Sequence, residues 1–228
     1  MIYFDNNSTT RVFQSTVEAM RPFLTEHFAN PASAIAQFGR IPQSIQANKA
    51  RLAKALGADA PDQLVITSGA TESNNLALLG TARAAPNRRH VIVSSIEHPS
   101  VMEVCELLRA DGYRISTLPV RPEGIVDEEA LAGMLAVDTL LVSVMLANNE
   151  TGVIQPVGSL AKTVKRRDPA VLIHTDATQA VGKMPIDLSG YLAEVDLLSL
   201  SAHKFHGPKG TGALFVRDNN ILAPILYG

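Results

Sequence analysis

The chain has 228 residues, 46% of them apolar, so it can bury a substantial core as one large domain or one domain with a short piece of another. A formal net charge of −2 and an isoelectric point near 6.3 give no electrostatic footprint for nucleic-acid binding. The single cysteine, Cys105, excludes an intramolecular disulfide framework, and no signal-peptide pattern or membrane-spanning apolar run is present, so we expect a cytoplasmic protein without a membrane partner.

The N-terminal region begins with polar and helical patterns. Residues 5–10 form a run of Asp, Asn, Ser and Thr that is too polar for a core and favours a helix-capping turn. Residues 12–28 have helical spacing, which Pro22 is expected to break. A cleaner helix is predicted over 41–56, and Gly57 follows it where a C-terminal glycine cap would lie.

From residue 63 onward, short β-branched runs alternate with amphipathic segments. The predicted strands cover 64–67, 90–94, 115–120, 140–145, 171–174, 197–200 and 213–216. The predicted helices among them cover 71–84, 100–110, 128–135 and 156–166. This alternation is typical of an α/β fold with a mostly parallel sheet covered by helices on both faces.

Two of these strands end in clusters of polar side chains. One cluster contains Asp176 and Gln179, and the other contains Ser201, His203 and Lys204. The spacing between the clusters allows a crossover that returns to the same sheet edge, where open parallel sheets bind ligands. A carboxylate facing an amine across a cofactor-sized gap suggests a ring held by Asp176 and joined to Lys204, an arrangement that pyridoxal phosphate requires.

The loop at 67–73 links a buried strand directly to a helix and contains Gly69 and several hydroxyl groups. Unpaired amides at a helix N-terminus can hold an anion, so a phosphate site is one interpretation. An ordinary capped turn is the alternative. Ser201 and His203 could supply further phosphate contacts if the two loops meet.

His98 and Asn149 follow two other predicted strands on the same edge. His98 could stack on a planar cofactor or carry a proton, although a hydrogen-bonded loop histidine is the common alternative. Asn149 could be a neutral donor beside a phenolic oxygen, or part of a plain turn. No His/Cys cluster has zinc spacing, so no metal site is expected, and the hydrolase elbow, Walker loop and dinucleotide-binding fingerprint are absent.

Seven motifs run in order along the chain: FDNNSTT, ANPAS, TSGATESNN, EHPSV, ANNETG, HTDATQAVGK and SAHKFHGPKGTG. In order and spacing they resemble the cysteine desulfurases of the NifS/IscS type, within the class V aminotransferase branch of the fold-type I pyridoxal-phosphate enzymes. The likeness covers the whole chain. It implies a cofactor-binding large domain at 16–228, incomplete at its C-terminal end, preceded by a segment at 1–15 associated with a small domain.

The resemblance also implies residue roles. Lys204 would bind the cofactor covalently and move the proton from the substrate Cα, while Asp176 would pair with the pyridine nitrogen. His98, the second catalytic residue, would stack on the ring. Gln179 would reach the phenolic oxygen, and Asn149 would lie between ring and substrate carboxylate. The phosphate would be held at Ala70, Thr71, Ser201 and His203.

The activity implied is conversion of L-cysteine to L-alanine, with the sulfur passing to an enzyme cysteine as a persulfide for iron–sulfur cluster or other sulfur assembly. The family forms homodimers and would use a sulfur-acceptor or scaffold partner. Its nucleophilic cysteine would lie beyond residue 228, together with most of the small domain, and Cys105 is expected to be a buried structural residue. The alternatives are an inactive cofactor-binding or dimerising remnant of the enzyme, and a selenocysteine lyase or another class V enzyme.

Overall fold

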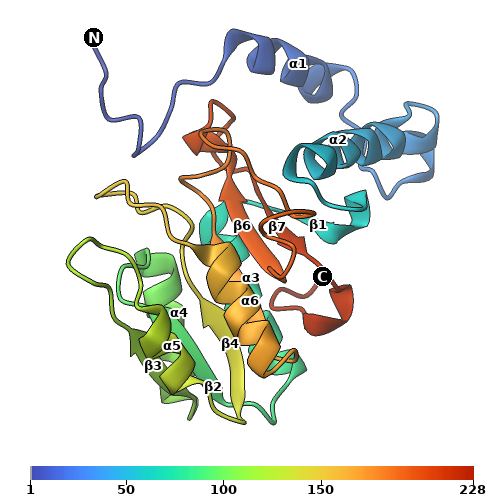
Figure 1. Ribbon diagram of the computed structural model, residues 1–228. Helices are drawn as coiled ribbons and strands as arrows, with labels where there is room; N and C mark the ends of the chain where they lie inside the picture. The colour runs from blue at the N-terminus through green and yellow to red at the C-terminus, as the bar shows by residue number, and fades with distance from the viewer. Residues whose placement is uncertain (1) are drawn as a thin grey trace.

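The computed structural model of the chain describes residues 2–228, apart from the side chain of Gln37. Helices cover both faces of a seven-stranded sheet (Figure 1). The α-helices are α1 (Gln14–Thr25), α2 (Ile41–Leu56), α3 (Ala70–Ala84), α4 (Pro99–Ala110), α5 (Glu128–Met134) and α6 (Val157–Arg167). The strands are β1 (Leu64–Thr67), β2 (His90–Ser94), β3 (Arg114–Leu118), β4 (Thr139–Ser143), β5 (Leu172–Asp176), β6 (Leu197–Ser201) and β7 (Gly212–Val216).

The strand order in the sheet is β1-β7-β6-β5-β4-β2-β3. Neighbours from β3 through β6 pair in parallel, while β7 pairs antiparallel with both β6 and β1. Only β7 is therefore reversed within the described sheet. The mostly parallel α/β fold predicted from the sequence is confirmed, and the carboxyl ends of β1, β2, β4, β5 and β6 meet at one edge.

Two cores lie on opposite faces of the sheet. One is formed with α2, α5 and α6, and the other with α3 and α4. Neighbouring residues of one strand enter different cores, as Leu214 and Phe215 of β7 do. Every residue of β2, β4, β6 and β7 is buried, which explains why these strands read as continuous apolar runs rather than as alternating ones.

The N-terminal helix differs from the prediction, because α1 continues through Pro22 to Thr25. Proline removes one backbone donor from a helix interior and often kinks or ends it. No residue of α1 is buried, so solvent can hydrate the carbonyl that Pro22 leaves without a donor. Figure 1 shows this helix at the periphery of the molecule.

Three strands end two residues away from their predicted ends. β3 ends at Leu118, because Val120 leaves the sheet and makes an isolated bridge with Val126. β4 ends at Ser143, two residues earlier than predicted. β5 extends to Asp176, where it still pairs in register with β6. The extension of β5 places the Asp176 carboxylate on a strand rather than on a loop.

A close backbone approach joins the β1–α3 loop to the start of β7. A Cβ atom on Gly212 would lie 2.6 Å from both the Cα of Gly69 and the carbonyl oxygen of Leu200. Real side chains do not tolerate such a contact, so only glycine fits at position 212. This contact fixes the loop that carries the N-terminus of α3 against the end of β6.

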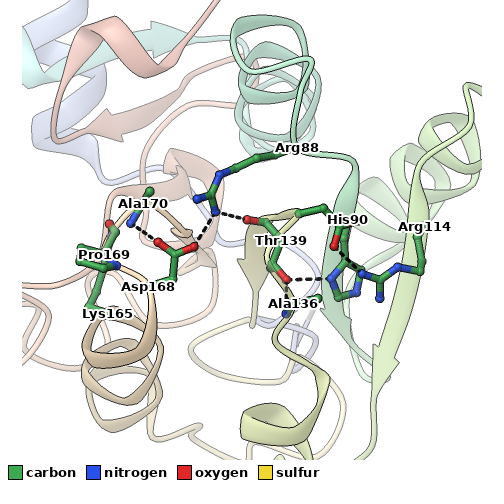
Figure 2. Close-up of polar contacts among 10 residues, drawn as sticks. Arg88, His90, Arg114, Ala136, Thr139, Lys165, Asp168, Pro169 and Ala170 are labelled. Carbon is green, nitrogen blue, oxygen red and sulfur yellow. Dashed lines mark hydrogen bonds and ion pairs between the residues drawn. The ribbon is translucent and has the colours of Figure 1, made fainter.

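At the opposite edge, where β2 and β4 begin, polar side chains form a network of hydrogen bonds and an ion pair (Figure 2). Arg88 donates to the carbonyl of Thr139 (2.6 Å) and to the carboxylate of Asp168 at the end of α6 (2.8 Å). The Nδ1 atom of buried His90 lies 2.8 Å from the Thr139 hydroxyl. Burial lowers the pKa of His90 to about 4, so this ring is neutral near pH 7. The network ties the starts of two strands to α6.

Candidate active site

A cavity of about 760 Å³ opens at the carboxyl edge of the sheet. Its walls come from the loops after β1, β2, β4, β5 and β6, together with the N-terminal segment. All of the predicted site residues line it, namely Ala70, Thr71, His98, Asn149, Asp176, Gln179, Ser201, His203 and Lys204. The structure thus brings together side chains from six separate segments of the chain, at the place where ligands bind in open parallel sheets.

Asp176 is the last residue of β5, and it is 5% exposed. Its Oδ2 accepts a hydrogen bond from the side-chain amide of Asn74 (2.9 Å), and its Oδ1 accepts one from the backbone N–H of Thr178 (2.9 Å). These two donors fix the carboxylate at the cavity wall. Asn74 lies on the fully buried face of α3, and no role was predicted for it from the sequence.

Lys204 ends a short 3₁₀ helix that directly follows β6. Its Nζ donates to the backbone carbonyls of Asn7 (2.8 Å) and Ser8 (2.7 Å). Burial lowers the pKa of the Lys204 amine, and the nearby carboxylates of Asp176 and Asp5 partly oppose that shift. The lowered pKa increases the fraction of neutral amine, which is the nucleophilic form.

The N-terminal polar run, predicted to be a capping turn, lines the cavity with Asn7, Ser8 and Thr9. The side-chain amide of Asn7 donates to the carbonyl of Asn149 (2.9 Å), and that of Gln179 donates to the carbonyl of Asn7 (2.7 Å). Thr10 donates through its hydroxyl to the carbonyl of His203 (2.9 Å). Asn7 therefore contacts three of the predicted residues, Lys204 included, and was missed as a site residue. The one sequence signal for it was a run too polar for the core.

The start of α3 forms a cradle suited to an anion. The backbone N–H groups of Ala70 and Thr71 have no acceptor among residues 2–228, as expected for a first helical turn. The hydroxyl of Ser201 approaches from β6, since it lies 3.5 Å from the place a Cβ on Gly69 would take. Together with the positive end of the α3 dipole, these groups provide donors for a phosphate.

An acidic side chain also lies beside this cradle. Glu72 accepts hydrogen bonds from both the backbone N–H (2.8 Å) and the hydroxyl (2.6 Å) of Ser68, and these bonds lower the pKa of Glu72. The carboxylate therefore stays ionised at the same helix end and opposes an anion. The exposed amine of Lys209 also lines the cavity.

His98 follows β2, which stops at Ser94 as predicted. It is the N-cap residue of α4, and its Nδ1 accepts a hydrogen bond from the backbone N–H of Ser100 (3.1 Å). The Ser100 hydroxyl lies 2.8 Å from the same nitrogen. A side-chain acceptor at a helix N-cap satisfies an otherwise unpaired amide, which accounts for the position of the ring.

His203 lies on the short helix that ends at Lys204, where its Nδ1 is 3.1 Å from the Thr9 hydroxyl. Burial, followed by the charges of Lys204 and Lys209, lowers the pKa of His203. A neutral ring beside these two amines is the form that this setting favours.

Two titratable groups are buried next to residues of the cavity wall. Glu97 accepts hydrogen bonds from the hydroxyl of Ser94 and from the backbone N–H of Met145 (2.7 Å), and burial raises its pKa to about 8. His174 lies between two serine hydroxyls on neighbouring strands, and burial lowers its pKa to about 4. Both groups are therefore neutral at pH 7.

Cys105 lies on the buried face of α4, where it is 1% exposed, and burial raises the pKa of its thiol to about 12. This confirms its interpretation as a buried structural residue, since a reactive cysteine needs an accessible thiolate. Over residues 2–228, no three His, Cys, Asp or Glu side chains gather as a metal site would require. Within the same residues, no helix combines the length and apolar character needed to cross a membrane.

Comparison with known sequences gives related proteins over the whole chain. "Cysteine desulfurase IscS" from Dictyoglomus turgidum is 44% identical over 229 residues, and the match spans 100% of this chain and 57% of the relative. "Cysteine desulfurase NifS" from Azotobacter vinelandii is 41% identical over 227 residues, with 100% and 56% covered. The chain thus spans a little over half the length of these curated relatives.

Solved structures agree with the sequence comparison. A "NIFS-LIKE PROTEIN" superposes with a TM-score of 0.94 at 39% identity and covers 100% of this chain and 62% of the other. A structure described as "SspA in complex with cysteine" superposes with a TM-score of 0.93 at 35% identity, covering 100% and 65%. A family model described as aminotransferase class-V matches residues 2–228. The chain therefore belongs to the class-V aminotransferase family, in the branch of its NifS- and IscS-like members.

Proposed function

We propose that this chain is the cofactor-binding part of a cysteine desulfurase that uses pyridoxal 5'-phosphate. The observation that carries the proposal is the convergence of a buried carboxylate, a lysine amine and an anion cradle on one cavity. The relatives named as cysteine desulfurases support the choice of reaction within the family. Because the chain spans only part of the length of those relatives, the substrate and partners below belong to the proposal.

The residues around the cavity fit pyridoxal phosphate. The hydroxyl of Thr178, at the cavity wall, is buried without a partner among residues 2–228, and the amides of Ala70 and Thr71 are likewise unpaired there. Those amides, with Ser201 and His203, would hold the phosphate. When bound, the cofactor withdraws electrons from the bonds at the substrate Cα.

Each polar group of the site then has a defined task. Asp176, oriented by its two donors, would hold a proton on the ring nitrogen. Lys204 would supply the amine that joins the cofactor and, when freed, would move the proton from the substrate Cα. His98 would stack on the ring, Gln179 would reach its phenolic oxygen, and Asn149 would lie beside the substrate carboxylate.

The proposed substrate is L-cysteine, which would leave as L-alanine while its sulfur passes to an enzyme cysteine and then to an acceptor for iron–sulfur cluster or other sulfur assembly. Cys105 is unsuited to this role because it is buried and its thiol pKa is about 12. One structural neighbour is described as a complex with cysteine, which supports this substrate class.

The proposal includes a segment at 1–15 associated with a small domain, a cofactor domain at 16–228 and a homodimer. The supporting observation is that α1 has no buried residue, while Phe23, Leu24 and Phe28 are 41%, 73% and 75% exposed. Large apolar side chains exposed on α1 and just beyond its end indicate an interaction surface.

Borohydride reduction of the chain mixed with pyridoxal phosphate tests the proposal. We expect one phosphopyridoxyl group on the peptide that contains Lys204, and none in Lys204→Ala. Lys209→Ala is the matched control, because Lys209 also lines the cavity but is exposed, so it should keep the adduct. Attachment at Lys209, or none in the native chain, would contradict the proposal. Because Cys105 is unsuited to accept the sulfur, we expect this chain alone to form no alanine from L-cysteine, and turnover would contradict that part of the proposal.

A further inference from the structure

A chain of hydrogen bonds connects Asp176 with the ring of His98 through two residues that have no assigned role. Asn74, which is fully buried, donates from Nδ2 both to Asp176 Oδ2 (2.9 Å) and to the hydroxyl oxygen of Ser100 (2.8 Å). An ionised carboxylate can only accept, so the amide must present its nitrogen to Asp176. Both N–H bonds of Asn74 are then used, and its Oδ1 has no partner in the described residues.

The direction of the next bond follows from the first. Because the Ser100 oxygen accepts from Asn74, its single hydrogen is free to donate to His98 Nδ1, 2.8 Å away. The backbone N–H of Ser100 donates to the same Nδ1 (3.1 Å). Two donors aimed at Nδ1 require it to be an acceptor, so the proton of the neutral ring is on Nε2.

We infer that Asn74 and Ser100 are positioning residues that hold His98 as the Nε2-protonated tautomer, so that the ring nitrogen left for a ligand is a hydrogen-bond donor. The described residues give Nε2 no partner, and His98 lines the cavity. If the proposed function holds, the Nε2–H group of His98 donates to an acceptor on the substrate. That acceptor is a carboxylate oxygen or a thiolate sulfur. A histidine whose tautomer is set by the hydrogen bond of its other nitrogen is a common device in catalytic sites.

The same bonds make the orientation of the ring depend on Asp176. The link passes from β5 through α3 to the first turn of α4, so a change at the carboxylate reaches His98 through only two side chains. A simple N-cap would need only the Ser100 N–H bond. A purely structural cap would not depend on Asn74. An effect of Asn74 on the tautomer of His98 therefore indicates a positioning role.

Long-range proton–nitrogen NMR of the histidine-labelled chain without cofactor tests the inference, with His98→Gln assigning the signal. We expect the Nε2-protonated tautomer in the native chain, and a several-fold shift toward the other tautomer in Asn74→Ala and Ser100→Ala. Ser100→Thr, which keeps the hydroxyl, should restore the native signal. Asn75→Ala is the matched control, because that amide donates to the carbonyl of Thr71 within α3 and should change nothing.

An Nδ1-protonated ring in the native chain would overturn the inference. So would a tautomer ratio in Ser100→Ala equal to that in Asn75→Ala. If buried Asn74 cannot be replaced without loss of folding, the half-buried Ser100 and its threonine variant decide the outcome alone. The measurement needs no cofactor. Failure to bind pyridoxal phosphate would therefore refute the proposed function and leave the inference about the His98 tautomer unaffected.

Discussion

Replacing Glu97 by glutamine measures the cost of burying a carboxyl group behind the cavity. One oxygen of Glu97 accepts from Ser94 and Met145, while the other is buried without a partner among residues 2–228. Glutamine can keep the accepting oxygen and place its uncharged amide at the unpaired position. The variant therefore removes the titratable carboxyl group while preserving the hydrogen bonds from Ser94 and Met145.

The magnitude follows from the shift in pKa of Glu97 from 4.5 to about 8. The folded state keeps the proton while the unfolded state loses it, so this group's contribution to stability is fully present below pH 4.5 and is lost as the pH rises to about 8. At about 1.4 kcal/mol per unit of pKa, raising the pH from about 5 to about 7 should cost the native chain roughly 2.5 kcal/mol relative to Glu97→Gln.

Urea unfolding at both pH values, followed by circular dichroism, gives the two differences in free energy. Glu103→Gln, at an exposed position on α4, controls for the change in net charge. Effects of all other titrating groups cancel between native chain and variant. A difference between native and Glu97→Gln that is the same at both pH values would show that Glu97 titrates as it does in the unfolded chain, and the reasoning would be refuted.

Further predictions concern packing and reactivity. Gly212→Ala should lower the free energy of unfolding by about 1–3 kcal/mol, because the added Cβ would make contacts of 2.6 Å. Gly133→Ala in α5 should raise it by about 0.5–1 kcal/mol, because nothing lies within 4 Å of the added Cβ. Equal effects of the two substitutions in urea unfolding would contradict this. Phe215→Ala, at a fully buried site, should cost about 3–5 kcal/mol in the same assay, and a cost below about 1 kcal/mol would contradict the core assignment. Cys105 should react with a thiol reagent only at the rate of unfolding, and rapid labelling of the folded chain would contradict its burial.

The sheet could be predicted because strands buried on both faces have unbroken apolar runs, which stand out between amphipathic helices. The reversal of β7 could not, because an apolar run such as GALFV has no direction. The continuation of α1 through Pro22 was also missed. That outcome depends on whether water reaches one carbonyl, which tertiary context decides rather than propensity.

Much of the candidate site could be predicted because polar side chains at the carboxyl ends of strands must meet at one edge. Asn7 was missed because its contacts with Gln179 and Lys204 span 172 and 197 positions of sequence, and no local pattern specifies them. Asn74 was missed for another reason. A buried amide in a helix reads as a polar interruption of the apolar face until its partners on β5 and α4 are known.

The central claim is that Lys204 and Asp176 hold one cofactor between them. Reduction of the chain with borohydride in the presence of pyridoxal phosphate, followed by peptide mass spectrometry, measures this most directly. We predict a single phosphopyridoxyl group on Lys204, and a much weaker yield at the same cofactor concentration in Asp176→Asn. A modification spread over the surface lysines, or one that is unchanged in Lys204→Ala, would contradict the claim.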